Sequence, residues 1–117
     1  MLLTSYRFWI LIFYICMIIV ISSIPSSQIR TISIIWEYDK YVHFFEYFVF
    51  GYLLLNAFMI TELNLGKWIV LFSFILLLPV LDESVQYFTP GRVADINDGL
   101  ADIAGGLSGL VFRQFLK

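Results

Sequence analysis

Residues 82–102 read DESVQYFTPGRVADINDGLAD, and this stretch decides the fold. It contains five carboxylates, one arginine and one glutamine, and it lies between two runs that are apolar enough to enter a bilayer. An ionisable side chain inside a transmembrane segment costs a few kcal/mol unless it is paired or hydrated. Charged residues in this position therefore indicate a site, and the apolar runs beside them predict the helices that carry it.

The composition of the chain is not that of a soluble domain. Of 117 residues, 61% are hydrophobic and only 14% are charged, which is more apolar surface than a soluble domain of this length can bury. The single cysteine, Cys16, excludes an internal disulfide or a cysteine metal centre within one chain. The sequence contains no Gly-rich phosphate loop and no basic nucleic-acid patch. We therefore expect an integral membrane protein that does not bind nucleic acid, with the lipid bilayer as its main partner.

Hydropathy predicts one domain over residues 1–117, an all-α membrane protein built as a four-transmembrane-helix bundle. The predicted helices span residues 6–24, 39–60, 67–88 and 94–115. Pro25 cannot continue the first helix. Between the first and second helices, a short segment ending in Trp36 and Tyr38 is expected to lie along the membrane interface, where such aromatic residues are enriched. A cleaved signal peptide is the alternative for the first helix, but no A-x-A site follows it.

The last three predicted helices are each polar over one third of their length, at one end only, whereas the first helix lacks this design. Short turns make these helices antiparallel, so the three polar ends are expected on the same side of the membrane. Four basic residues flank the side opposite the polar ends, namely Arg7, Lys67, Arg113 and Lys117. Three lie on the polar side, Arg30, Lys40 and Arg92, and the last two of these belong to the polar stretches themselves. By the positive-inside rule we expect both termini in the cytoplasm and an outward-facing site.

At 100° per residue, the polar third of each helix forms a stripe on one face. The stripes consist of Asp39, His43 and Glu46 on the second helix, Glu83 and Gln86 on the third, and Asp95, Asp98 and Asp102 on the fourth. Eight acids against three basic residues on this side give a net charge of −5, so either some carboxylates are protonated or a cation is bound. A divalent metal is one candidate for that cation, although no spacing here matches a specific metal motif.

Two residues suggest chemistry at this site. His43 is the only histidine and could act as a general acid or base, with Asp39 or Glu46 orienting its ring. The alternative is a histidine that only forms a hydrogen bond between helices. Arg92 could grip a phosphate or carboxylate through two parallel hydrogen bonds, or it could neutralise a neighbouring aspartate.

Small residues on the fourth predicted helix form a face on which another helix can approach closely. This face contains Ala101, Gly105 and Gly109, with Ala104 and Ser108 alongside.

Three ordered motifs resemble the VanZ-like family of small bacterial membrane proteins. They are Asp39-Lys40-x-x-His43-Phe44-x-x-Tyr47, then Glu83-x-x-Gln86-x-Phe88-x-Pro90-Gly91-Arg92, then Asp98-x-x-x-Asp102-x-x-Gly105. Many members have asparagine where this chain has Asp102, so this chain carries an additional charge. Glu46, Asp82 and Asp95 lie outside the motifs and are interpreted as supporting charges.

The resemblance implies a multi-pass protein of the bacterial cytoplasmic membrane. Through the family's namesake, it also implies a link to low-level resistance to the glycopeptide antibiotic teicoplanin. It does not imply a settled biochemical activity.

We expect an outward-facing site that binds or processes an anionic amphiphile of the cell envelope, such as a lipid-linked cell-wall precursor or a phospholipid. The expected catalytic residues are His43, Asp39, Glu83 and Asp98, and the expected substrate-binding residues are Lys40, Tyr47, Gln86, Arg92 and Asp102. If the protein is an enzyme, hydrolysis or group transfer at a phosphate or acyl bond is the expected class. The alternatives are a proton- or cation-coupled transport or binding module and a structural membrane partner without catalysis. A homodimer is possible under each of these hypotheses.

Overall fold

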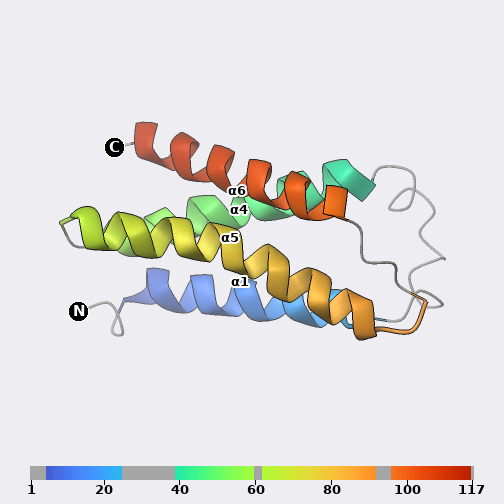
Figure 1. Ribbon diagram of the computed structural model, residues 1–117. Helices are drawn as coiled ribbons and strands as arrows, with labels where there is room; N and C mark the ends of the chain where they lie inside the picture. Colours follow the sequence, from blue (N-terminus) through green and yellow to red (C-terminus); the bar gives the residue numbers. More distant parts are fainter. Residues whose placement is uncertain (1–4, 25–38, 60–61, 92–95, 117) are drawn as a thin grey trace.

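The computed structural model describes residues 5–24, 39–59, 62–91 and 96–116. The described residues form four helices and no strand: α1 (Tyr6–Ser22), α4 (Asp39–Phe58), α5 (Leu65–Phe88) and α6 (Ile96–Phe115) (Figure 1). The all-helical prediction is confirmed, and each observed helix begins and ends within two residues of the predicted bounds. The predicted interfacial segment over residues 28–38 lies outside the described residues.

Side-chain caps explain where two of the helices begin. Helix α1 follows Ser5, whose hydroxyl accepts a hydrogen bond from the Arg7 backbone N–H at 3.1 Å. Helix α5 follows Asn64, whose side chain accepts the Lys67 N–H at 2.9 Å. Such caps satisfy backbone donors that have no partner inside the helix. The cap at Asn64 therefore starts α5 two residues earlier than hydropathy predicts.

Consecutive helices run in opposite directions, so the polar ends of α4, α5 and α6 meet at one end of the bundle, as the sequence predicts (Figure 1). The start of α1 and the end of α6 lie at the opposite end. Away from the polar end, the described core is aliphatic and aromatic. It includes Leu11 and Ile18 of α1, Phe50, Leu54 and Leu55 of α4, Leu71 and Ile75 of α5, and Leu110 of α6.

The closest helix pair is α4 with α6, which pack along buried glycines. A Cβ atom at Gly105 would collide with the backbone carbonyl of Phe44, and one at Gly109 would collide with that of Phe48. The predicted small-residue face of α6 is therefore confirmed at these two glycines, whereas Ala104 is exposed. Absence of side chains at the contact lets the two backbones approach closely.

Among the described helices, α5 alone is both long and apolar enough to cross a membrane, and α1 is apolar but only 17 residues long. Helices α4 and α6 do not meet both requirements, and both contain charged residues, which lower the mean hydropathy of a helix. Large apolar side chains such as Phe13, Leu77 and Val111 nevertheless cover the outer faces of the helices. Extended apolar surface of this kind marks contact with lipid or with another protein.

We expect Gly109→Ala to lower the free energy of unfolding by about 1–3 kcal/mol, because its new Cβ would overpack a backbone contact. The matched control is Gly99→Ala on the same helix, where the new Cβ would meet no atom of another helix within 4 Å. That control should be neutral or more stable by up to about 1 kcal/mol, because alanine favours a helix over glycine. Thermal unfolding in detergent measures both variants. Equal melting temperatures would contradict the close packing of α4 against α6.

Candidate functional site

Buried polar side chains from all four helices gather at the polar end of the bundle. They are Ser22 of α1, His43 of α4, Asp82 and Gln86 of α5, and Asp98 and Asp102 of α6. We call these residues, together with the buried Tyr47, the polar cluster. A buried charge is stable only when it is paired or hydrogen-bonded, so the partners of these side chains determine what the cluster can do.

His43 lies between two carboxylates of α6. Its Nδ1 atom is 2.7 Å from Oδ1 of Asp102, and its Nε2 atom is 3.8 Å from Oδ2 of Asp98. An ionised carboxylate only accepts hydrogen bonds, so Nδ1 carries the proton when Asp102 is ionised. Asp102 therefore orients the ring, a role that the sequence suggested for Asp39 or Glu46. The side chain of Asp39 lies outside the described residues.

The spacing of the two aspartates explains this arrangement. Asp98 and Asp102 are one helical turn apart, so both face α4 and reach opposite sides of a single ring. Lys40, one turn before His43 on α4, forms an ion pair with Asp98. The lysine side chain is 46% exposed whereas the aspartate is 5% exposed, so the pair joins the surface to the buried cluster.

Asp82 is the centre of a second hydrogen-bond network. The Ser22 hydroxyl donates to its Oδ1, and the Tyr47 hydroxyl donates to its Oδ2 at 2.9 Å. Helix α1 thus contributes to the cluster through its last residue, although its sequence shows no polar stripe. Asp82 and Gln86, four residues apart, form the buried face of this part of α5. In the sequence this spacing does not single out Asp82, because Glu83 lies three residues before Gln86 and shares its face equally well.

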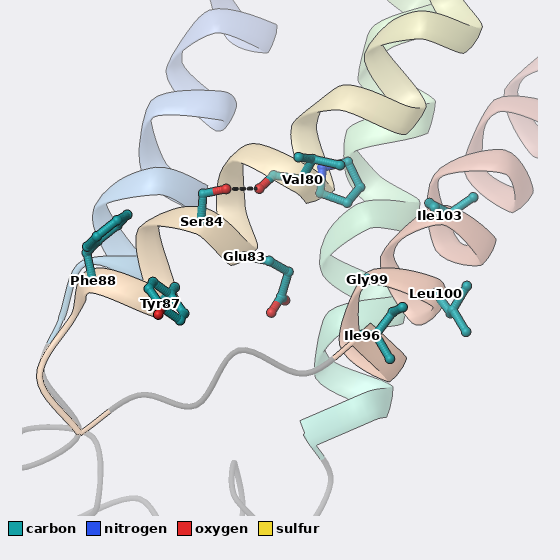
Figure 2. Close-up of a pocket in the computed structure, with 10 residues that line it drawn as sticks. Val80, Glu83, Ser84, Tyr87, Phe88, Ile96, Gly99, Leu100 and Ile103 are labelled. Atoms are coloured by element: carbon teal, nitrogen blue, oxygen red, sulfur yellow. Dashed lines mark hydrogen bonds between the residues drawn. The ribbon is translucent and has the colours of Figure 1, made fainter.

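An apolar groove with a volume of about 590 Å³ runs beside the polar cluster, between the second half of α5 and the start of α6. It is lined by Pro79, Val80, Glu83, Ser84, Tyr87 and Phe88 of α5 and by Ile96, Gly99, Leu100 and Ile103 of α6. Figure 2 shows these side chains around the opening, with the Glu83 carboxylate extending from α5 toward α6. The Ser84 hydroxyl donates within its own helix, to the Val80 carbonyl at 2.7 Å.

Glu83 connects the groove to the polar cluster. It lines the groove, and one of its carboxylate oxygens, a His43 nitrogen and an Asp98 oxygen all lie within 4.8 Å of one another. One end of the groove is therefore polar while its walls are apolar. A second group with the same spacing is formed by His43, Asp82 and Asp102, so either group could hold a metal ion.

The structure brings together most of the residues that the sequence singled out. Lys40, His43, Tyr47, Glu83, Gln86, Asp98 and Asp102 lie at the same end of the bundle. Arg92 and Asp95 lie outside the described residues. Tyr47 and Asp102 are completely buried, so neither side chain is exposed to solvent.

We expect Tyr47→Phe to lower the free energy of unfolding by about 1–3 kcal/mol, because it removes a donor to a buried carboxylate and leaves the ring in place. Tyr87→Phe is the control, since Tyr87 is 71% exposed and keeps its ring contact with Phe88 as a phenylalanine. Chemical or thermal unfolding in detergent measures the difference. Equal stability of the two variants would show that the Tyr47 hydroxyl does not support Asp82.

Comparison with known proteins gives one match. A family model described as VanZ/LLP1 matches residues 8–117. No curated protein and no solved structure matches the chain. The matched range contains every residue of the polar cluster and both walls of the groove. The chain therefore belongs to the VanZ/LLP1 family.

Proposed function

We propose that this protein is a multi-pass protein of the bacterial cytoplasmic membrane that binds an anionic amphiphile of the cell envelope. The observation that carries the proposal is the position of Glu83, which belongs both to the apolar groove and to the group formed with His43 and Asp98. An amphiphile has the same pattern, because an apolar chain is joined directly to a polar headgroup. In this proposal the chain occupies the groove and the headgroup faces the polar cluster.

The walls of the groove suit the apolar part of such a ligand. Its volume of about 590 Å³ lies within the range of roughly 300–1,000 Å³ typical of small-molecule pockets. Leu100 and Phe88 of its lining are strongly exposed on the outer surface, at 59% and 81%. A lipid chain could therefore enter from the side, without first leaving the bilayer.

The headgroup would be attracted by Lys40, which is half-exposed beside the cluster. An anionic headgroup can compete with Asp98 for this ammonium group, since both are anions that a lysine binds as a point charge. Arg92 remains a second candidate anion clamp on sequence grounds. Lipid-linked cell-wall precursors and phospholipids both carry phosphate, which is the chemistry that these cations would recognise.

If the bound amphiphile is also processed, His43 is the expected proton carrier. Asp102 holds one ring nitrogen at 2.7 Å, which fixes the orientation of the ring as general acid–base catalysis requires. Hydrolysis or group transfer at a phosphate or acyl bond is the reaction class that this arrangement supports. An outward-facing site with both termini in the cytoplasm would place this chemistry among cell-wall precursors, where a link to teicoplanin resistance would act.

Binding is favoured over transport by the distribution of polar groups. The polar cluster occupies one end of the bundle, and the described core beyond it consists of residues such as Leu54, Leu71 and Leu110. A pathway for ions or protons across the membrane needs polar groups along its whole length.

We expect Leu100→Trp to weaken binding of a polyprenyl phosphate at least tenfold, because a bulky ring would fill the groove that the chain occupies. Leu77→Trp is the control, since Leu77 is equally exposed on α5 but does not line the groove. Native mass spectrometry of the protein titrated with the lipid in detergent measures the bound fraction. Similar weakening in both variants would contradict the proposed position of the chain.

The headgroup is tested with the same lipid and with the uncharged polyprenol of equal chain length. We expect the phosphate to bind about tenfold more tightly, and we expect Lys40→Gln to reduce this preference because one cation is lost. Arg92→Lys should also reduce it if the arginine binds phosphate through two parallel hydrogen bonds. Lys67→Gln, at the opposite end of α5, should leave the preference unchanged. Equal binding of phosphate and alcohol by the natural protein would rule out recognition of an anionic headgroup.

A further inference from the structure

We propose that His43, Asp82 and Asp102 bind one divalent metal ion inside the bundle. This inference goes beyond amphiphile binding and does not depend on it. The first observation concerns Asp102, whose side chain is completely buried. Its Oδ1 atom contacts His43, but its Oδ2 atom has no hydrogen-bond partner among the described residues. A buried carboxylate oxygen without a donor is rare in proteins, and a bound cation is one way to satisfy it.

The second observation is the geometry around this oxygen. One ring nitrogen of His43 and one oxygen each of Asp82 and Asp102 lie within 4.8 Å of one another, and all three residues are buried. Metal–ligand bonds to such atoms are about 2.0–2.2 Å long, so two ligands on opposite sides of one ion are about 4.2 Å apart. The three groups can therefore close on a single ion with small side-chain adjustments, provided that the ligating His43 nitrogen releases its proton when the metal binds.

The surroundings of Asp82 also fit a ligand role. Its oxygens accept hydrogen bonds from Ser22 and Tyr47, and a carboxylate oxygen that accepts a hydrogen bond can also bind a metal ion. Carboxylates that bind metals are usually oriented by hydrogen bonds from outside the coordination sphere. The ligands come from α4, α5 and α6, so the ion would tie three helices together, as metal sites in helical bundles do.

The charge balance favours a divalent ion at these residues over the neighbouring group that contains Glu83. In that group Asp98 is already paired with Lys40, and Glu83 is only partly buried. Asp82 and Asp102 would bring two negative charges into the interior, which one divalent ion would offset. Imidazole with two carboxylates suits a first-row ion such as Zn²⁺ or Mn²⁺.

The test measures metal content and thermal stability of the full-length protein in detergent. After incubation with ZnCl₂ or MnCl₂ and removal of unbound metal, we expect about one ion per chain by elemental mass spectrometry. Asp102→Asn should lower metal affinity at least about tenfold, because it removes the negative charge and replaces one of the two carboxylate oxygens with an NH₂ group, which cannot bind a metal. Glu62→Gln, which changes an exposed carboxylate at the opposite end, should bind metal like the natural protein.

Melting temperatures separate metal binding from a structural effect of the substitution. Adding metal to the chelator-treated natural protein should raise its melting temperature by several degrees, but it should not raise that of Asp102→Asn. Without metal, Asp102→Asn should melt at a temperature close to that of the natural protein, because the amide oxygen can still accept a hydrogen bond from His43 while a buried negative charge is removed. If Asp102→Asn does not fold, His43→Gln should show the same loss of metal. Absence of bound metal and of any rise in melting temperature in the natural protein would overturn the proposal, as would full metal content in both variants.

Discussion

The close contact between α4 and α6 is the constraint on which the rest of this structure depends. Gly105 meets the backbone of Phe44, the residue next to His43, and lies three residues after Asp102. The distance of 2.7 Å between the histidine and this aspartate is thus set by a backbone contact less than one helical turn away. A larger side chain at Gly105 would push the two helices apart. This would break the contact between His43 and Asp102 although neither of these two residues is substituted.

Pro79 divides α5 into two segments that pack against different parts of the protein. A proline inside a helix cannot donate a backbone hydrogen bond, and it commonly bends the helix. Before it, Leu71 and Ile75 pack in the apolar core. After it, the helix slants away from α6 toward α1 (Figure 1), where Thr89 and Asp82 form hydrogen bonds with Ser22. The same bend accounts for the groove, whose lining begins at the proline and continues to the end of the helix.

The sequence predicted the helices and the end at which the polar residues meet, because apolar run length and short turns determine both. It also predicted that His43 belongs to a polar stripe at that end, since residues three and four apart share a face. It named Asp39 or Glu46 as the residue that orients the ring, whereas the ring contacts Asp102 of α6. It did not predict the roles of Asp82 and Ser22. Asp82 and Glu83 are about 100° apart on one helix, and only packing decides which of them faces the interior. Ser22 is a residue type that is common at helix ends, so its sequence position gives no sign of a buried role. Its hydrogen-bond partner, Asp82, is 60 residues away in the sequence. The groove could not be predicted either, because hydrophobic periodicity does not show in which direction a helix bends at Pro79.

The positions of the groove and the cluster have a consequence for specificity. Aliphatic and aromatic walls distinguish one lipid chain from another by little more than size, since each additional methylene changes binding only slightly. Discrimination among lipids must therefore arise at the polar end, where Glu83, Lys40 and His43 approach the groove. Because carboxylates outnumber cations among the described residues there, an anionic headgroup is accepted only if its charge is offset. A metal ion held by Asp82 and Asp102 would lower the negative potential around His43, and it would make the same pocket more favourable for a phosphate.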